Sequence, residues 1–263
     1  MQALDFAAGP RTLCAMLRAT RFVRLGLLLF FALPLAAHAL VTWQTSDLSI
    51  GWRSADWSST GTLPAAPQMP EAMVRIYCAP VGGWRSIFAV HCWVVYKEAG
   101  AAAYQRYDVM GYSGVPIRHN RFPPDGKWYG NTPELVAETT GTAAAALIPK
   151  VKAAIADYPF AGMGDYVIWP GPNSNTFIAH VVRQVPELQA VLPSTAIGKD
   201  FPVDGQWLDW APSRTGVTAS LGGYAGLTLA WVEGVEINVL GAVAGLDLRQ
   251  PGIKLPGFGR IGL

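Results

Sequence analysis

The chain has 263 residues, of which 51% are apolar and 14% charged, and its formal net charge at pH 7 is +2. This length suits one sizeable domain with appendages, and the composition excludes an intrinsically disordered or highly charged chain. So small a net charge gives no basis for nucleic-acid binding, and we expect no nucleic-acid partner.

An apolar run near the N-terminus, Leu25 to Val41, follows a basic segment in which Asp5 is the only acid. A basic flank before an apolar run is typical of an export signal or an N-terminal membrane anchor. The small residues around His38 resemble a cleavage site, whereas Trp43 is suited to an interfacial anchor. We expect an uncleaved membrane anchor, with the main domain on the side away from the arginines. The predicted divisions are a basic tail (1–21), the anchor (22–41), a linker (42–70), an α+β domain (71–213) and a β-rich extension (214–263).

Three apolar segments with β-branched and aromatic residues predict an antiparallel meander: Met73–Cys78, Ile87–Tyr96 and Ala103–Gly111. His91 lies in the central strand, where a satisfied core histidine is the alternative to a catalytic base. A turn centred near Gly100 puts Asp108 or Val109 opposite His91, so Asp108 is suited to orient the imidazole. The alternative for Asp108 is a solvated carboxylate at a strand end.

The same meander bears on the cysteines. Consecutive strand residues point to opposite faces, so Cys92 cannot pair with His91. With a turn centred near Gly83, Cys78 falls across from Phe88 rather than from Cys92. The two sulfurs are then too far apart, and we predict no disulfide.

The segment that follows the meander is a basic loop, residues 114–130, with interleaved aromatic side chains. Trp128 and Tyr129 are candidate ligand contacts, and the alternative is a surface loop pinned by its aromatics. Four scattered histidines and three cysteines give no metal-ligand spacing, so we expect no metal site and no cofactor. Residues 133–158 are predicted to be helical in two pieces, divided at Pro149.

A short strand (Tyr166–Trp169), a Pro-Gly-Pro breaker and an apolar-periodic segment predict a helix that begins near Asn173. Ser174 is then a candidate nucleophile, with backbone amides near Ser174 and Asn175 as oxyanion donors. The alternative is that Asn173 or Ser174 is only a helix N-cap. His180 falls nearly on the opposite side of the helix and is not expected to act as the base.

Short β runs between residues 216 and 248 predict a second meander, which we expect to form an apolar second sheet layer. The Pro- and Gly-rich tail, residues 250–263, is expected to be extended.

The order of a strand histidine followed by the motif Asn173-Ser174-Asn175-Thr176-Phe177 resembles circularly permuted papain-like proteins. Those include the lecithin retinol acyltransferase-like and permuted NlpC/P60-like groups, in which a cysteine stands where this chain has Ser174. More closely, the chain resembles the bacterial domain of unknown function 3750, through RSADWSS, FAVHCWVV, PDGKWYGN, WPGPNSNTF, VPEL and TAIGKDF. That family brings no established activity. Because that family is bacterial, the N-terminal anchor predicts a protein of the bacterial inner membrane whose main domain faces the periplasm or the exterior.

The sequence therefore predicts a permuted papain-like α+β fold and two functions for its cleft. The first is acyl transfer, with Ser174 as nucleophile, His91 as base and Asp108 as orienting residue. Its substrate class is an envelope amide or ester, such as a peptidoglycan peptide or a lipid. The second is ligand binding without catalysis. A helix N-terminus helps a cysteine to ionise to the thiolate, whereas a serine hydroxyl must lose its proton to a base during the attack, so the change from cysteine to serine favours this second function. Asn173, Asn175, Trp128 and Tyr129 are the predicted binding residues, and the sequence leaves the oligomeric state open.

Overall fold

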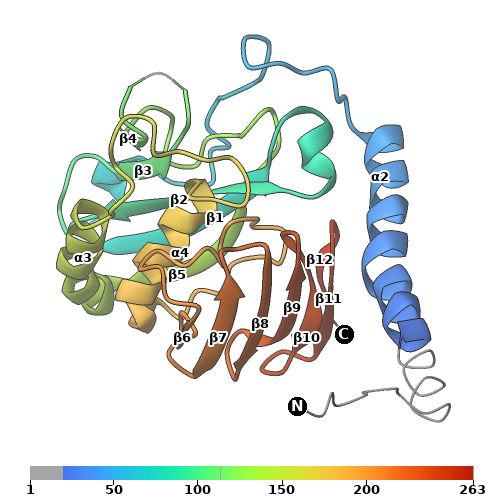
Figure 1. The fold of residues 1–263 in the computed structure, drawn as a ribbon. Coiled ribbons are helices and arrows are strands. Elements are labelled where there is room, and N and C mark those ends of the chain that lie inside the picture. The colour runs from blue at the N-terminus through green and yellow to red at the C-terminus, as the bar shows by residue number, and fades with distance from the viewer. Residues whose placement is uncertain (1–19, 113, 263) are drawn as a thin grey trace, which may run out of the picture.

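Two antiparallel sheets organise the chain in the computed structural model, which describes residues 20–112 and 114–262 (Figure 1). The chain is thus α+β, as predicted, with few helices. The predicted basic tail lies outside the described residues except for Thr20 and Arg21, and Cys14 lies outside them too. A long apolar helix, Thr20–Thr45, precedes the sheets and includes a π-helical stretch η1 (Leu28–Ala32) and the regular α2 (Leu33–Thr45). By length and composition this helix could cross a membrane, and a signal sequence fits the same description.

The first sheet has the strand order β4-β3-β2-β1-β5. Its strands are β1 (Met73–Pro80), β2 (Val90–Lys97), β3 (Gln105–Val109), β4 (Ile117–His119) and β5 (Glu134–Thr140). Three short 3₁₀ helices join the elements: η2 (Ala66–Gln68), η3 (Gly83–Ile87) and η4 (Pro186–Leu188). The predicted meander is present, and β2, with His91, lies inside the sheet.

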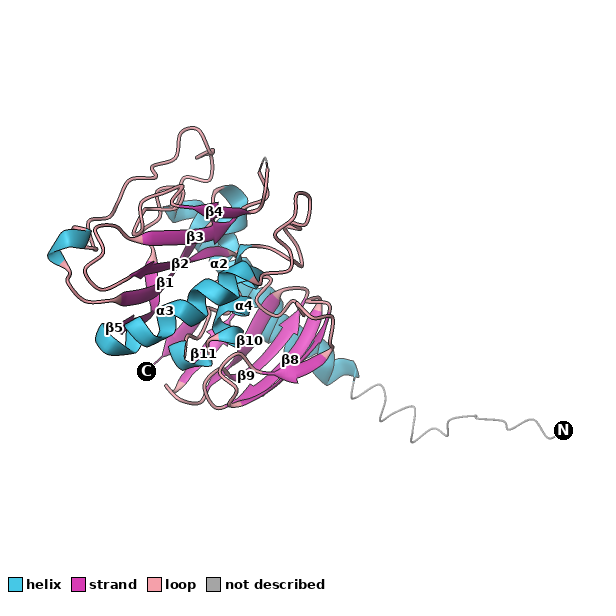
Figure 2. Cartoon of the chain, turned by 90° about the vertical axis from the view of Figure 1, so that its left-hand side faces the viewer, coloured by secondary structure: helices cyan, strands magenta, loops and turns pink. Residues whose placement is uncertain are grey.

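Helices α3 (Gly141–Ala156) and α4 (Ser174–Gln184) cover one face of this sheet, as Figure 2 shows. The core between them contains alternate residues of β2, Cys92 and Val94, with Phe177 and Ile178 of α4. The residues between these, such as Trp93 and Val95, pack in a second cluster on the other face with Trp128. Because side chains alternate along a strand, His91 belongs to the second face, away from α4.

The predicted absence of a disulfide is wrong, because Cys78 and Cys92 are bonded. Their strands pair so that the two cysteines face each other directly, with a Cα–Cα distance of 4.1 Å. The predicted turn centre, Gly83, was two residues too early. The 3₁₀ helix η3 lengthens this connection and moves the centre of the hairpin to Arg85.

Two further predictions in this domain fail. Residues 134–140 form strand β5 rather than a helix, because they pair with the otherwise free edge of β1. The helix starts only at Gly141, whose φ of +64° turns the chain out of the strand, and it continues through Pro149. Residues 166–169 form no regular strand and lead into cis peptide bonds before Pro170 and Pro172.

The second sheet is a seven-stranded meander in sequence order. Its strands are β6 (Leu208–Trp210), β7 (Gly216–Leu221), β8 (Ala225–Ala230), β9 (Gly234–Val239), β10 (Ala242–Asp247), β11 (Gly252–Leu255) and β12 (Gly259–Gly262). The tail predicted to be extended therefore supplies β11 and β12, joined by a turn in which Gly257 has a φ of +81°. The expectation of an apolar layer packed on the domain is wrong, because the face that packs towards α4 is polar and the apolar face points outward.

Candidate functional site

A buried chain of polar groups starts at His91, the second residue of β2, whose side chain is 5% exposed. Its Nε2 lies 3.5 Å from Asp108 Oδ2. The same carboxylate oxygen accepts a hydrogen bond of 2.8 Å from Arg106 Nη2, and the Arg106 guanidinium lies 4.1 Å from the centroid of the Trp93 ring. Asp108 is therefore neither solvated nor unpaired, and it lies beside His91, as the predicted orienting role would require.

The charge states of His91 and Asp108 follow from their burial and their pairing. Burial lowers the pKa of His91, so the imidazole is neutral near pH 7. Burial alone would raise the pKa of Asp108, but the hydrogen bond from His91 and the charge of Arg106 outweigh it and lower that pKa. The pair thus consists of an ionised carboxylate and a neutral histidine, which can donate from Nε2 and keep Nδ1 as an acceptor.

Trp128 fixes the plane of the histidine ring. The two rings stack with their centroids 3.7 Å apart and their planes within 5°. Trp128 is itself held by a backbone bridge to Asn131, whose side chain donates to Pro80 O at 3.1 Å. The predicted ligand residues Trp128 and Tyr129 both line the cavity described below, and Trp128 also serves the packing that the alternative interpretation assigned to it.

Asn173, and not Ser174, caps helix α4. Its Oδ1 accepts from the backbone amides of Asn175 (2.9 Å) and Thr176 (3.2 Å), and Thr176 Oγ1 accepts from Asn173 N at 3.1 Å. This reciprocal pair is a capping box. Ser174 is the first residue of the helix, and its hydroxyl makes no hydrogen bond within residues 20–112 and 114–262. The cap interpretation therefore accounts for Asn173 and leaves Ser174 unexplained.

Asn175 fastens the start of the helix to the sheet. Its Nδ2 donates to Val90 O and to Ile197 O, each at 2.9 Å. Because Val90 directly precedes His91, this bond holds the first turn of α4 at the start of β2. The backbone amide of Asn175 is already bonded to Asn173, so of the two predicted oxyanion donors only the amide of Ser174 remains.

A cavity of about 750 Å³ brings these residues together. His91, Ser174, Asn173 and Asn175 lie on its wall, which is otherwise mostly apolar. Part of that wall comes from the N-terminal helix, through Leu27, Phe31, Ala32 and Leu35, and part from the turns of the second sheet, through Leu240, Gly241, Pro256 and Gly257. Within the described part of the chain no hydrogen bond joins His91 to Ser174. The two residues approach the cavity from opposite faces of the first sheet, around the start of β2.

Sequence reasoning missed Ser194, a second serine on the cavity wall. Its Oγ is buried and has no hydrogen-bond partner among the described residues. No motif or spacing marks this residue, which lies in an irregular segment. The other three histidines make contacts elsewhere: His180 Nε2 lies 3.1 Å from Ala154 O between the helices, His119 stacks on Tyr107, and His38 of α2 contacts Ile87 and Phe258. No group of three or more His, Cys, Asp and Glu side chains suited to a metal ion occurs in the described ranges.

The fold and cavity define an α+β domain in which a histidine paired with a buried carboxylate and a serine that does not cap its helix both line one largely apolar pocket. Residues 71–201 match the family model for a protein of unknown function, DUF3750, and through this segment the chain belongs to that family. The segment contains His91, Asp108 and Ser174, as well as Ser194. No curated protein and no solved structure matches the chain.

Proposed function

We propose that this protein is an acyl-transfer enzyme, a hydrolase or an acyltransferase, built on a permuted papain-like scaffold. The observation that carries the proposal is the shared cavity, where a histidine held by Asp108 and Trp128 accompanies a serine hydroxyl that the helix cap does not use. Sites of this kind need a nucleophile, a base and a group that orients the base.

In the proposed reaction Ser174 Oγ attacks the carbonyl carbon of an ester or amide while His91 Nδ1 takes the hydroxyl proton. The oxyanion forms at the N-terminus of α4, where the Ser174 amide and the helix dipole stabilise negative charge. His91 then returns the proton to the leaving alcohol or amine, and water or a second acceptor releases the acyl group from Ser174. Substrate binding must bring the two side chains into hydrogen-bond reach, as commonly happens when a substrate-free site closes on its substrate.

The apolar wall indicates the substrate class. Aliphatic and aromatic side chains of the N-terminal helix and aliphatic ones of the second sheet line the same cavity as the polar groups. An amphiphilic envelope molecule, with an acyl chain along this wall and its ester or amide at Ser174, fits the cavity better than a peptidoglycan peptide, which is polar throughout.

The proposed location is the bacterial inner membrane, with the domain in the periplasm or exterior. The arginines before the apolar helix favour this orientation. The Cys78–Cys92 disulfide supports it independently, because disulfides persist in oxidising compartments outside the cytoplasm.

A fluorophosphonate probe, which reacts with activated serines, tests the proposal. We expect the probe to label the full-length protein on Ser174, and Ser174→Ala to abolish labelling. His91→Gln is expected to lower the labelling rate by about 10²-fold or more. Ser194→Ala is the matched control, because it removes a serine from the same cavity and should leave labelling unchanged. Labelling that persists in Ser174→Ala, or maps to Ser194, contradicts the assignment.

The second candidate is a non-catalytic binding protein that uses the same cavity. It is favoured by the engaged amide of Asn175 and by the missing hydrogen bond between His91 and Ser174 among the described residues. In this case a fluorescent long-chain fatty acid should bind the wild type and Ser174→Ala equally, and no probe should attach. Ala89→Trp, which fills part of the cavity wall, should prevent binding in either case.

A further inference from the structure

The seven-stranded sheet buries its polar side chains and exposes its apolar ones, the reverse of an ordinary antiparallel sheet. Side chains alternate along its strands between an inner face, towards α4, and an outer face. The outer face, as used below, is the one that carries Val217, Leu227, Leu229, Ile237, Leu246 and Ile253, each between 40% and 50% exposed. Antiparallel sheets with one solvated face normally expose the polar side chains and bury the apolar ones.

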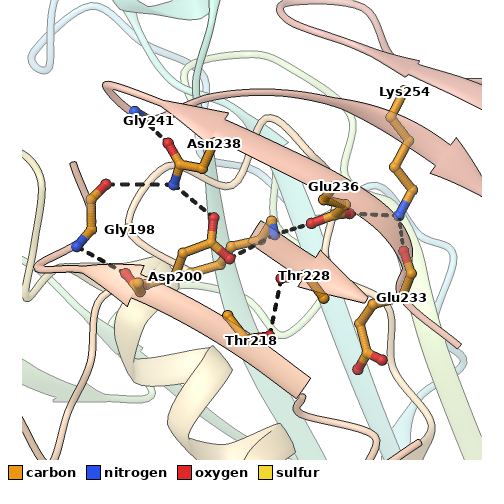
Figure 3. A network of polar contacts seen from close by, with 12 residues as sticks. Gly198, Asp200, Thr218, Thr228, Glu233, Glu236, Asn238, Gly241 and Lys254 are labelled. Atoms are coloured by element: carbon orange, nitrogen blue, oxygen red, sulfur yellow. Dashed lines mark hydrogen bonds and ion pairs between the residues drawn. The ribbon is translucent and has the colours of Figure 1, made fainter. Parts of the chain in front are cut away.

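The polar side chains of the sheet lie on the inner face and are satisfied there. Glu236 accepts from Lys199 at 2.5 Å and from Lys254 at 2.6 Å, and Asn238 donates to Asp200 Oδ2 at 2.8 Å (Figure 3). Thr218 and Thr228 are hydrogen-bonded to each other across neighbouring strands at 3.0 Å. Charged partners placed so specifically fix the register of the sheet, because a slip of one residue would send them to the outer face. The outward position of the apolar residues is therefore built into the fold.

An exposed face of this kind needs an apolar neighbour. It extends over strands β7 to β11, whereas monomeric soluble proteins rarely expose contiguous apolar patches beyond a few hundred Å². The edge of the outer face adjoins the N-terminal helix, since η1 contacts β10 and Phe31 lines the same cavity as Val239 and Ala242. Figure 1 shows α2 standing beside this sheet.

That helix is itself apolar and exposed. Its side chains Phe22, Leu28 and Phe30 are 72%, 48% and 57% accessible. A single apolar medium that surrounds the helix would also reach the adjoining outer face. A second copy of the chain seated on the sheet would cover the outer face and leave the helix uncovered.

We propose that the outer face of the seven-stranded sheet rests in the lipid bilayer beside the N-terminal helix, as a second membrane-contact element. The sheet does not span the bilayer, because its strands have three to six residues, whereas membrane-spanning strands need about 9–11. It is also open at β6 and β12, and open sheet edges do not occur in the hydrocarbon core. The outer face therefore lies in one leaflet near the surface. Exposed Trp210 and Trp231, near strand ends, suit the lipid–water interface.

Site-directed spin labels in the full chain test this placement. A nitroxide is attached at Leu227→Cys or at Ile237→Cys in a Cys14→Ser background that keeps the native disulfide. The protein is reconstituted into phosphatidylcholine and phosphatidylglycerol vesicles. Collisions are measured with oxygen, which concentrates in lipid, and with a water-soluble nickel chelate. Lys152→Cys on α3 is the control, on the opposite side of the molecule from α2 in Figure 1.

We expect both outer-face labels to gain oxygen collisions and to lose nickel collisions relative to the control label. Equal access of nickel at all three positions overturns the proposal. Protection from both reagents, together with spin–spin broadening between labels, also overturns it and identifies a second copy of the chain as the occupant. Retention of the wild-type melting temperature by each variant establishes that the fold is intact.

Discussion

Ser174 and Asn173 are neighbours with different structural roles, so their substitution separates stability from activity. Asn173→Ala removes the helix cap and two side-chain bonds to carbonyl groups, and we expect a loss of about 1–2 kcal/mol in the free energy of unfolding. Ser174→Ala removes a hydroxyl without a hydrogen bond in the described part of the chain, and the expected change is within about 0.5 kcal/mol. Urea unfolding in detergent measures both, and a large loss in Ser174→Ala would show that the serine is structural.

The buried histidines make stability depend on pH. Burial lowers the pKa of His91 and of His180 in the folded protein, whereas the unfolded chain titrates near pH 6.5. Below about pH 6.5 the unfolded chain therefore binds more protons, and the free energy of unfolding falls as the pH is lowered from about 7 to 5. The lowered pKa of Asp108 acts only near and below about pH 4, outside this window.

His91→Gln should flatten this pH dependence, because it removes one of the two groups responsible. His119→Gln, which removes an exposed histidine on β4, is the matched control for the substitution itself. The measurement is urea unfolding at three pH values in the window. An unchanged slope in His91→Gln would mean that this imidazole has the same pKa in the folded and the unfolded protein, contrary to its burial.

At the site, counting along strands brought Asp108 near His91, although the predicted register, with Asp108 or Val109 opposite His91, was wrong by at least one residue. The observed β2–β3 register continues to Met110 opposite His91, and Asp108 reaches the histidine as a diagonal neighbour. Sequence could not reveal that Asn173 rather than Ser174 is the cap, because both residue types cap helices well. It also could not reveal the cavity wall, since that wall joins elements from opposite ends of the chain.

Among the elements, the β1–β2 hairpin depends on its disulfide. The bond joins residues 14 positions apart, and a closed loop of that size lowers the entropy of the unfolded chain by an amount worth about 3 kcal/mol. We therefore expect reduction to lower the free energy of unfolding by roughly 2–4 kcal/mol. Cys78→Ala/Cys92→Ala should show a comparable loss and no further response to reductant. A reductant effect of the same size in that double variant would place its origin elsewhere.

The stability of the second sheet depends on its buried ion pairs. Glu236→Gln leaves Lys199 and Lys254 without their shared carboxylate, and the expected loss is about 3–5 kcal/mol. Glu187→Gln is the matched control, because the Lys150–Glu187 pair is half exposed and should contribute at most about 1 kcal/mol. Thermal unfolding of both variants decides the point. Equal, small effects would show that the network is dispensable for stability.

The helices and strands were predicted correctly where they follow from the local sequence pattern, and wrongly where they depend on pairing with another strand. The β1–β3 meander follows from alternation and turn residues, whereas β5 is a strand because β1 offers it an edge, which no local propensity records. The strands β11 and β12 lie in a segment whose Gly and Pro content suggested an extended tail, and β10 supplies the pairing that orders them. The inverted second sheet was hidden because alternation reveals two faces without saying which one is buried.

For the molecule as a whole, the contacts of the N-terminal helix bear on whether it is removed. His38 Nδ1 lies 2.5 Å from Ile87 O, and the ring meets Phe258 of the β11–β12 turn edge-on at 4.8 Å. Gly257 fits closely against the same histidine, where a Cβ would lie 2.8 Å from the ring. A cleavage at the small residues around His38 would discard these contacts and one wall of the cavity.

We therefore expect the mature protein to keep its N-terminal helix as an anchor. Intact mass measured on protein purified from membranes should include residues 22–41, and alkaline carbonate should fail to extract the protein. Gly257→Val should loosen the helix from the domain, because it places a branched side chain at the His38 contact and at a backbone φ that favours glycine. Gly61→Val, at a positive φ with open space around it, is the control for backbone strain alone. A mature N-terminus near residue 40 would instead identify the helix as a signal peptide and leave the outer face of the second sheet as the membrane contact of the released domain.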